Sequence, residues 1–389
     1  MKNGQRIHGI DALRAIAMLL GVVFHATLAY KVTPHGPGVP HDNEFNHWFF
    51  DLFAFFIHSF RMPLFFLIAG YFCRFLYYKI GEREFVYHRL KRIGIPFVVG
   101  IFIIVPLSLM PLNMYTFVYK QNLSWDLALK KSVGKLFTIN GIFHLWFLYD
   151  LLIYYSCTVV AMRAKRIVFV MKIFERLSAW WQKLSFNSIM WPILLSVPIW
   201  IILFFEPDLF VFVDVHIIPR HFTYIFFYGY LFLLGWLLHK RSDIFTLLIR
   251  QKAFFLGTGL ALCFLLFYAE WNKEVYAVTS WWYMAKFLAC LQVMFLILGS
   301  VGFFLYYFNA ESYFWRYVSD ASYWVYLTHV FVVVWLQLLF LNSGIPGLLR
   351  FPLVLLITTI ITFSTYHWFV RYTIIGNILN GKRNRNKSR

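Results

Sequence analysis

An arginine and a histidine stand eleven residues apart in an apolar stretch near the N-terminus, RAIAMLLGVVFH, which runs from Arg14 to His25. Histidine can accept a proton near neutral pH, and the guanidinium of arginine can hold a phosphate or a carboxylate. In an α-helix, eleven residues return to nearly the same face and rise about 16 Å along the axis. We therefore expect both side chains to line one internal channel at different depths.

Two other interpretations of this pair remain open. Arg14 can extend towards the lipid headgroups or pair with Asp11, three residues before it, and His25 can be a hydrogen-bonded packing residue. Ionisable side chains inside a membrane span cost several kcal/mol and usually face a bundle interior, a cavity or a partner. The polar residues of the apolar stretches are therefore the ones that indicate function.

A second apolar stretch, DLFAFFIHSFRMPLFFLIAGYF (51–72), holds a denser group of polar residues. His58 and Arg61 are three residues apart and share a helical face, and Asp51 lies close to that face at the outer end. Pro63 frees a backbone carbonyl and kinks a helix, which is tolerated where protein or a cavity satisfies the backbone. The group predicts a site, with a structural pair of Asp51 and Arg61 as the alternative.

Three other histidines are weaker candidates. His144 begins the stretch HLWFLYDLLIYY near Asp150 and, taken alone, is typical of an interfacial histidine. His329, in SYWVYLTH, and His367, in TYHWFV, are expected to be satisfied core residues. The four cysteines show no spacing typical of a disulfide framework or a metal site, and no metal is predicted.

The composition assigns the chain to the membrane proteins. Of 389 residues, 61% are hydrophobic and only 14% are charged, whereas soluble domains are about one half apolar and about one quarter charged. The net charge of +19 falls between the apolar stretches on one side, which argues for a lipid bilayer as the partner and against nucleic acid. Ten stretches are long enough to cross a bilayer: 10–30, 52–78, 93–113, 143–162, 189–206, 221–238, 253–269, 281–306, 321–341 and 351–375.

The distribution of Lys and Arg sets the orientation. With a cytoplasmic N-terminus, most of the 36 Lys and Arg fall in cytoplasmic connections, so the positive-inside rule places both termini in the cytoplasm. The predicted fold is an all-α, polytopic bundle of about ten transmembrane helices, forming one domain (1–389) with a basic tail (376–389). The outer connections 31–48 and 115–143 are expected to roof a pocket, and the second contains an amphipathic helix, WDLALKKSVGKLF.

The segment DALRAIAMLLGVVFH resembles the first span of the membrane acyltransferase 3 family. The family's later motifs follow in order, as FRMPLFFLIAGYF, HRLKRIGIPF, HLWFLYDLLIYY and SYWVYLTH. Within the family, FFIHSFRMPLFFLIAGYF followed by RLKRIGIP is most similar to the glucan-modifying branch. The resemblance is specific over 6–104, clear at 143–155 and 319–329, and only hydropathic elsewhere.

The resemblance implies a multi-pass O-acyltransferase of the bacterial inner membrane. Its donor is expected to be a cytoplasmic acyl-CoA, succinyl-CoA or acetyl-CoA, with no tightly bound cofactor. Its acceptor is a hydroxyl of a periplasmic glucan or another surface polysaccharide. Homo-oligomerisation is left open.

Specific roles follow if the reaction is acyl transfer. His25 is expected to be the general base, oriented by a carboxylate from Asp51 or from the 31–48 loop, and an acyl-histidine intermediate remains open. Arg14 is expected to hold a donor phosphate or carbonyl, since its distance from the base is comparable with the reach of a pantetheine arm. The remaining phosphates of CoA are assigned to Arg89, Lys91 and Arg92.

The second span supplies the remaining candidates. Arg61 and His58 are expected to stabilise the thioester oxyanion or position the acceptor, and Arg61 is the candidate cation for a succinyl carboxylate. His144 joins His58 among the substrate-binding candidates. Two other classes stay open: a secondary transporter that exports a sugar or lipid-linked intermediate, although no inverted repeat or paired broken span is found in the sequence, and a purely structural membrane subunit.

Overall fold

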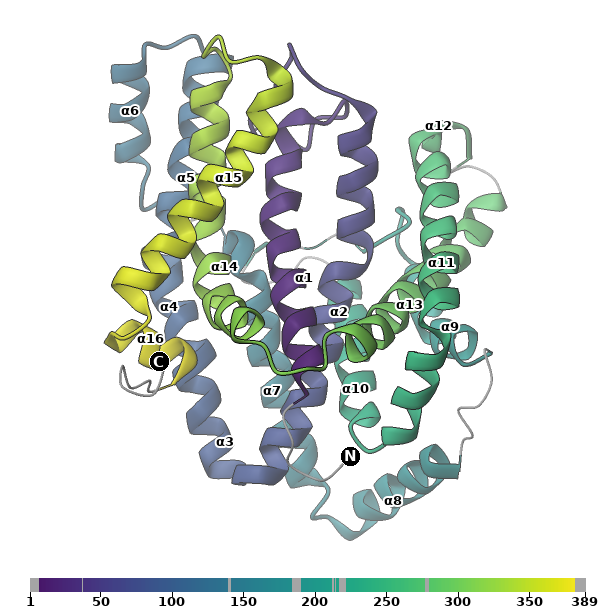
Figure 1. The fold of residues 1–389 in the computed structure, drawn as a ribbon. Helices are drawn as coiled ribbons and strands as arrows, with labels where there is room; N and C mark the ends of the chain where they lie inside the picture. Colours follow the sequence, from purple (N-terminus) through teal and green to yellow (C-terminus); the bar gives the residue numbers. More distant parts are fainter. Residues whose placement is uncertain are drawn as a thin grey trace.

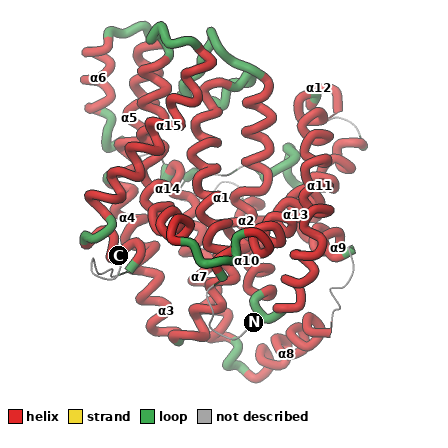
Figure 2. Tube along the Cα trace, viewed as in Figure 1, coloured by secondary structure: helices red, strands yellow, loops and turns green. Residues whose placement is uncertain are grey.

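The computed structural model describes residues 7–36, 38–138, 141–183, 190–211, 213, 215, 216, 222–276 and 280–381. Within these residues all the regular elements are helical (Figures 1 and 2), which confirms the predicted all-α class. The longer helices are α1 (His8–Thr27), α2 (Trp48–Ile80), α5 (Ile104–Tyr115), α6 (Trp125–Gly134), α7 (Trp146–Ala164), α8 (Val168–Lys183), α9 (Trp191–Leu203), α10 (Thr223–Leu238), α11 (Ser242–Trp271), α13 (Trp281–Tyr307), α14 (Tyr313–Phe340) and α15 (Gly347–Thr365). The shorter ones are η1 (Leu28–Tyr30), α3 (Glu82–Arg89), η2 (Leu90–Gly94), α4 (Ile95–Phe102), η3 (Thr116–Lys120), η4 (Phe143–Leu145), α12 (Lys273–Tyr276), η5 (Tyr366–Val370) and α16 (Ile374–Asn380).

The apolar helices follow the predicted spans. Among the described residues, eight helical segments are long and apolar enough to cross a membrane, and α9 and α10 are shorter apolar helices of 13 and 16 residues. At 1.5 Å per residue, these two reach only about 20 and 24 Å, less than the roughly 30 Å of bilayer hydrocarbon. The chain is a multi-pass membrane protein, and its fifth and sixth predicted spans are shorter than expected.

The third span is segmented rather than one straight helix. It extends over Glu82–Lys120, and α4 ends at Phe102, two residues before α5 begins. Pro106 has no N–H to donate to the carbonyl of Phe102, and its ring crowds that carbonyl, so the helix breaks there. Near its start the segment contains η2, a π-helical turn of a kind frequent at functional sites.

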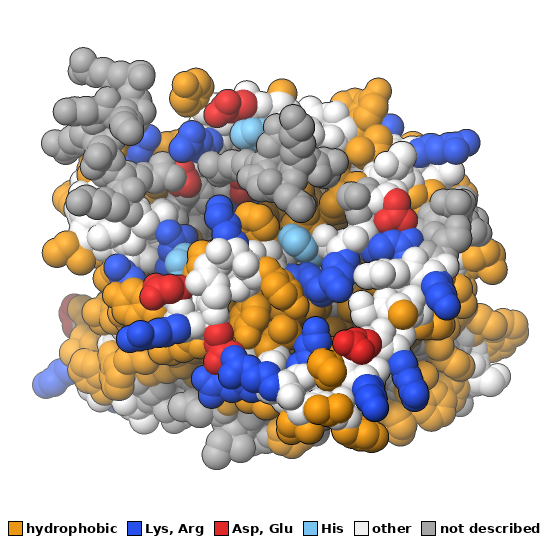
Figure 3. All heavy atoms as spheres, turned by 90° about the horizontal axis from the view of Figure 1, so that it is seen from below, with side chains coloured by type: hydrophobic (Ala, Val, Ile, Leu, Met, Phe, Trp, Pro, Cys, Tyr) orange, Lys and Arg blue, Asp and Glu red, His pale blue; other side chains and the backbone are white. Residues whose placement is uncertain are grey.

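Basic side chains gather at one end of the bundle. In Figure 1, α1 begins in the lower half, where α3, α8 and α16 also lie, and the connection between α1 and α2 is at the top. Seen from below, that face carries many Lys and Arg side chains (Figure 3). The positive-inside rule makes this face the cytoplasmic one. Of the predicted basic tail, 382–389 lies outside the described residues, and α16 forms the part before it.

Two glycines let α2 and α10 pack backbone to backbone. A Cβ on Gly70 would lie 1.8 Å from the carbonyl oxygen of Phe232, and a Cβ on Gly235 would lie 1.8 Å from that of Leu67. Small residues at such crossings are how membrane helices approach closely. The contact fixes α2, which carries His58 and Arg61, against the rest of the bundle.

The outer connection between α1 and α2 is tied down by ion pairs. Arg350 of α15 donates from Nη1 to Asp42 and from Nη2 to Glu44, both at 2.7 Å. Arg350 and Asp42 are both buried, so this pair holds the connection firmly over the outer end. The predicted amphipathic helix of the second outer connection is present as α6, which packs on α5.

Replacing Gly70 with alanine is expected to destabilise the fold, because the new Cβ forces two backbones apart, with overpacking costs of about 1–3 kcal/mol. The thermal unfolding midpoint of the detergent-solubilised variant measures the effect. Gly257→Ala in α11 is the matched control, since a Cβ there meets nothing within 4 Å and the midpoint should not fall. Equal midpoints for the two variants would contradict the backbone contact.

Candidate active site

Two cavities meet inside the bundle. One, of about 360 Å³, is lined by the arginines of α1, α3 and η2, and the other, of about 340 Å³, is lined by histidines. We call them the inner cavity and the outer cavity. Four side chains line both: Met18, Phe65, Phe147 and Tyr326. These four, here called the neck, come from α1, α2, α7 and α14 and separate the two spaces.

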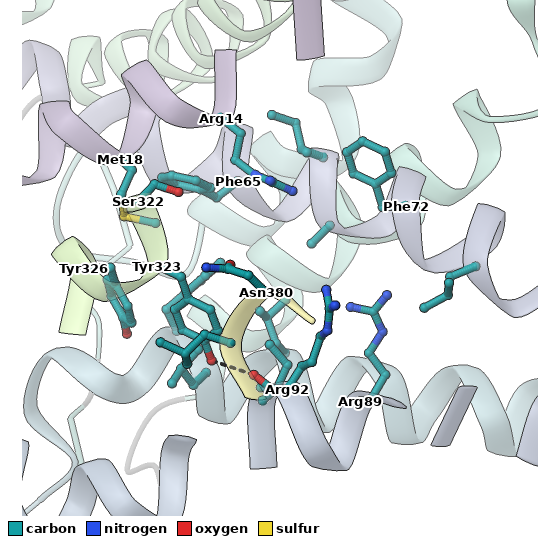
Figure 4. A pocket seen from close by; sticks show the side chains of 18 of the residues that line it. Arg14, Met18, Phe65, Phe72, Arg89, Arg92, Ser322, Tyr323, Tyr326 and Asn380 are labelled. Atoms are coloured by element: carbon teal, nitrogen blue, oxygen red, sulfur yellow. Dashed lines mark hydrogen bonds between the residues drawn. The ribbon is translucent and has the colours of Figure 1, made fainter. Parts of the chain in front are cut away.

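Three arginines face the inner cavity from two sides. Figure 4 shows Arg14 on one side and Arg89 and Arg92 on the other, with their guanidinium groups turned towards the same space. Nη2 of Arg14 donates to the Ser319 hydroxyl at 2.8 Å and lies 3.7 Å from a carboxylate oxygen of Asp11. The pair with Asp11 is therefore present, and it leaves Arg14 in the cavity wall.

Aromatic rings and one hydrogen bond hold the other two arginines. The guanidinium of Arg89 lies over the ring of Tyr155, 4.8 Å from its centroid, and its buried Nε has no hydrogen-bond partner among the described residues. The Tyr323 hydroxyl donates to the carbonyl of Arg92 at 2.8 Å, which fixes the π-helical turn. Guanidinium groups in this arrangement suit a phosphate. Lys91 does not line the cavity.

Imidazoles from several elements surround the outer cavity. They are His25 of α1, His35 of the outer connection, His58 of α2, His144 of η4 and His329 of α14. The Phe24 ring contacts two of the side chains in one wall. It stacks on the His58 ring, with centroids 5.6 Å apart, and the guanidinium of Arg61 lies 5.4 Å from the Phe24 centroid. His25, His58 and Arg61, predicted from the first two spans, are thus brought together, and His144 joins them.

Two of the histidines are fixed by backbone carbonyls. Nδ1 of His329 lies 2.9 and 2.8 Å from the carbonyl oxygens of Val325 and Tyr326, and Nε2 of His144 lies 3.3 Å from that of Leu327. A carbonyl oxygen accepts hydrogen bonds and cannot donate them, so Nδ1 of His329 and Nε2 of His144 carry the protons. The other ring nitrogens, Nε2 of His329 and Nδ1 of His144, are left as acceptors, and both are buried without a partner among the described residues.

Arg61 has no anionic partner within the described ranges of the chain. Among the described residues it makes no hydrogen bond or salt bridge, and its Nε is buried. Gly21 makes room for it, since a Cβ there would lie 2.3 Å from Nη1. The alternative pair of Arg61 with Asp51 is not formed. The guanidinium is therefore available for a carboxylate or for an oxyanion in the cavity.

Asp51 does not line the outer cavity. Its buried carboxylate accepts from the backbone N–H groups of Val32, at 2.7 Å, and Thr33, at 3.3 Å, and lies 3.7 Å from the ammonium of Lys31. Partial burial lowers the pKa of Lys31, although the negative charge of Asp51 opposes this shift. Asp51 thus anchors the start of the connection that brings His35 to the cavity, and its carboxylate is engaged there instead of orienting a base.

Sequence reasoning placed His329 in the core and did not consider His35. His329 is indeed buried and hydrogen-bonded, but it also lines the outer cavity. Whether His329 lines the cavity depends on the rotation of α14 about its axis, and the sequence pattern did not predict that rotation. His367 is exposed instead of being a core residue, and its Nδ1 lies 3.4 Å from the Tyr317 hydroxyl.

The fold and the site define a membrane protein with two adjoining internal cavities, and comparison identifies its class. Residues 7–367 match the model of the acyltransferase 3 family, described as an acyltransferase domain. The chain therefore belongs to that family of membrane acyltransferases, as its first-span motif predicts.

Several curated relatives carry one name. The chain is 33% identical over 149 residues to glucans biosynthesis protein C of Salmonella paratyphi B, Salmonella dublin and Salmonella gallinarum. The match covers 38% of this chain and 37% of each relative, so it spans little more than a third of their length. No solved structure matches the chain.

Gly21→Ala is expected to displace Arg61 and lower acyl transfer by at least about tenfold. Complete removal of one preorganised hydrogen-bond donor to an oxyanion costs about 10²–10³-fold in rate, and displacement loses part of that. The thermal midpoint should stay near that of the wild type, since the displaced atom ends a flexible side chain. Gly134→Ala in α6 is the control, because its Cβ meets nothing within 4 Å. If Gly21→Ala transfers the acyl group at the wild-type rate, the role of Arg61 in the site is contradicted.

Proposed function

We propose that this protein transfers a succinyl or acetyl group from cytoplasmic acyl-CoA to a hydroxyl of a periplasmic glucan, in the bacterial inner membrane. The observation that supports this proposal is the junction of an arginine-lined cavity and a histidine-lined cavity at one neck. The family gives the reaction class, and the name of the relatives, glucans biosynthesis protein C, supports a glucan as the proposed acceptor.

The inner cavity binds the donor in this proposal. Arg14, Arg89 and Arg92 hold phosphates of CoA, and Lys91, outside the cavity wall, adds to the positive potential that attracts them. The pantetheine arm then passes the neck and brings the thioester into the outer cavity. The rise of about 16 Å between Arg14 and His25 along α1 matches such an extended arm.

The outer cavity carries out the transfer. His25 accepts the proton of the glucan hydroxyl while the hydroxyl oxygen attacks the thioester carbonyl. Arg61 stabilises the negative charge that develops on the carbonyl oxygen. The C–S bond then breaks, and the thiolate takes the proton back from His25. The products are a glucan ester and free CoA. His58 and His144 line the space for the sugar.

Arg61 lines the outer cavity with no ion-pair partner among the residues that the structure describes, and it favours a dicarboxylic acyl group over acetyl. A succinyl group has a free carboxylate that can pair with Arg61, whereas an acetyl group has none, and charge-assisted pairs are the stronger ones. Succinyl is therefore the acyl group that this cavity suits better.

The base and the acyl group are tested with purified protein, a glucan acceptor and labelled succinyl-CoA or acetyl-CoA. His25→Ala should lower transfer from either donor by about 10²–10⁴-fold, the range for general-base catalysis, and leave a residual rate. Arg61→Gln should reduce transfer of succinyl by about tenfold more than that of acetyl, the loss of one charged hydrogen bond. Full transfer by a folded His25→Ala variant contradicts the base role. An equal loss with both donors assigns Arg61 to the oxyanion alone.

Donor binding is tested at the inner cavity. Arg89→Gln and Arg92→Gln should each raise the KM for acyl-CoA about tenfold with little change in kcat, because each removes a charged contact to a phosphate. Arg83→Gln is the control, since Arg83 is an exposed arginine of α3 that does not line the cavity. The same KM in all three variants contradicts the donor site.

The acceptor is tested in cells by mass spectrometry of periplasmic glucans from a strain that lacks the gene. Loss of their acyl substituents is the expected result, and re-expression of the wild type but not of His25→Ala should restore them. Unchanged succinyl and acetyl content contradicts the glucan assignment. Substrate flux without consumption of acyl-CoA supports a transporter instead.

A further inference from the structure

His329 lies next to the ring of the proposed base in the wall of the outer cavity. We propose that His329 orients His25, holding it in the tautomer that leaves one nitrogen free for the glucan hydroxyl. His329 then takes the place that a carboxylate occupies in catalytic triads. This inference rests on the proposed function, because it assumes that His25 is the base.

A neutral histidine that acts as a base needs an acceptor for its other nitrogen. The unprotonated nitrogen receives the hydroxyl proton, so the second nitrogen carries a hydrogen that must be bound if the ring is to keep its orientation. Asp51, the carboxylate that the sequence suggested for this role, is engaged by the backbone of Val32 and Thr33. The orienting acceptor must therefore come from another element.

His329 has the required acceptor in the required place. Its ring is held by the bonds from Nδ1 to two carbonyls, so Nε2 is an acceptor, and the side chain is 3% exposed with Nε2 unpartnered among the described residues. The ring centroids of His25 and His329 are 5.2 Å apart. A direct N–H···N bond of about 2.9 Å places two imidazole centroids roughly 5 Å apart.

The rings of His25 and His329 are tilted by 56° to each other in the structure. Because their separation already suits an N–H···N bond, a rotation of the His25 ring is enough to align it. Catalytic hydrogen bonds are commonly misaligned without substrate and tighten in the complex. The backbone of His25 is itself fixed, since Nε2 of Gln337 donates to its carbonyl at 3.0 Å. The side chain can therefore turn while the helix stays in place.

The other groups around His25 are less suited to this role. Arg61 is only a donor, and His58 stacks on Phe24. His144 packs on His329, with centroids 6.2 Å apart, and supports that ring. His35 comes from the exposed outer connection.

The proton balance involves only His25. The hydroxyl proton moves to the free nitrogen of His25, and the resulting imidazolium shares its other hydrogen with Nε2 of His329, which keeps its own proton on Nδ1. When the thiolate leaves, His25 returns the proton and the hydrogen bond remains. His329 is a positioning residue that acts through the base.

The test uses His329→Phe, which fills the space without an acceptor, and His329→Gln, which keeps an acceptor oxygen at a similar reach. His329→Phe should lower kcat about 100-fold, within the range for general-base catalysis, and leave the KM for acyl-CoA within about twofold, whereas His329→Gln should regain about tenfold. His367→Phe, at an exposed histidine outside both cavities, is the control and should keep wild-type activity.

Each variant is then combined with His25→Ala. Because His329 acts through His25, His329→Phe should cost nothing further on that background, whereas losses that simply multiply would show a structural role and overturn the inference. Wild-type kcat in His329→Phe, or a His329→Gln variant as slow as His329→Phe, would also overturn it. If the wild type itself transfers no acyl group, the proposed function fails.

Discussion

The Arg61 guanidinium has no carboxylate partner in the part of the chain that the structure describes, and the site depends on this charge inside the helical bundle. An unpaired charge removed from water costs several kcal/mol, and Arg61 is tolerated because it lies over the ring of Phe24, in space that Gly21 leaves free, beside an open cavity. The cation–π interaction with the Phe24 ring offsets only about 0.5–2 kcal/mol of that cost. The remainder favours any anion that enters, which is the physical basis of the proposed preference for a negatively charged acyl group or intermediate.

One helix, α1, runs from the outer cavity to the inner cavity, where the proposed donor binds. Arg14 and His25 lie on α1, one in each cavity, and the neck between them is apolar except for Tyr326, whose hydroxyl donates to the carbonyl of His144. Cations are thus concentrated in the cytoplasmic half and imidazoles in the outer half. Such a division suits a donor with several phosphates and an acceptor that needs a base, and the apolar neck separates the two cavities.

The sequence predicted the features that depend on helical periodicity. The shared face of Arg14 and His25, the ten apolar helices and the amphipathic helix α6 all follow from spacing and composition. The partners of Asp51 could not be predicted, because they are set by the conformation of an irregular connection. The exposure of His329 to the cavity depends on the rotation of α14, and the break after Phe102 depends on how one proline is accommodated.

The sidedness of the reaction tests the two-cavity mechanism most directly. Proteoliposomes that contain the protein, with glucan trapped in the lumen and labelled acyl-CoA added outside, keep donor and acceptor on opposite sides of the bilayer. Acylated glucan should accumulate in the lumen with the wild type and not with His25→Ala. Acylation that occurs only when donor and glucan share one compartment would contradict transfer through the neck.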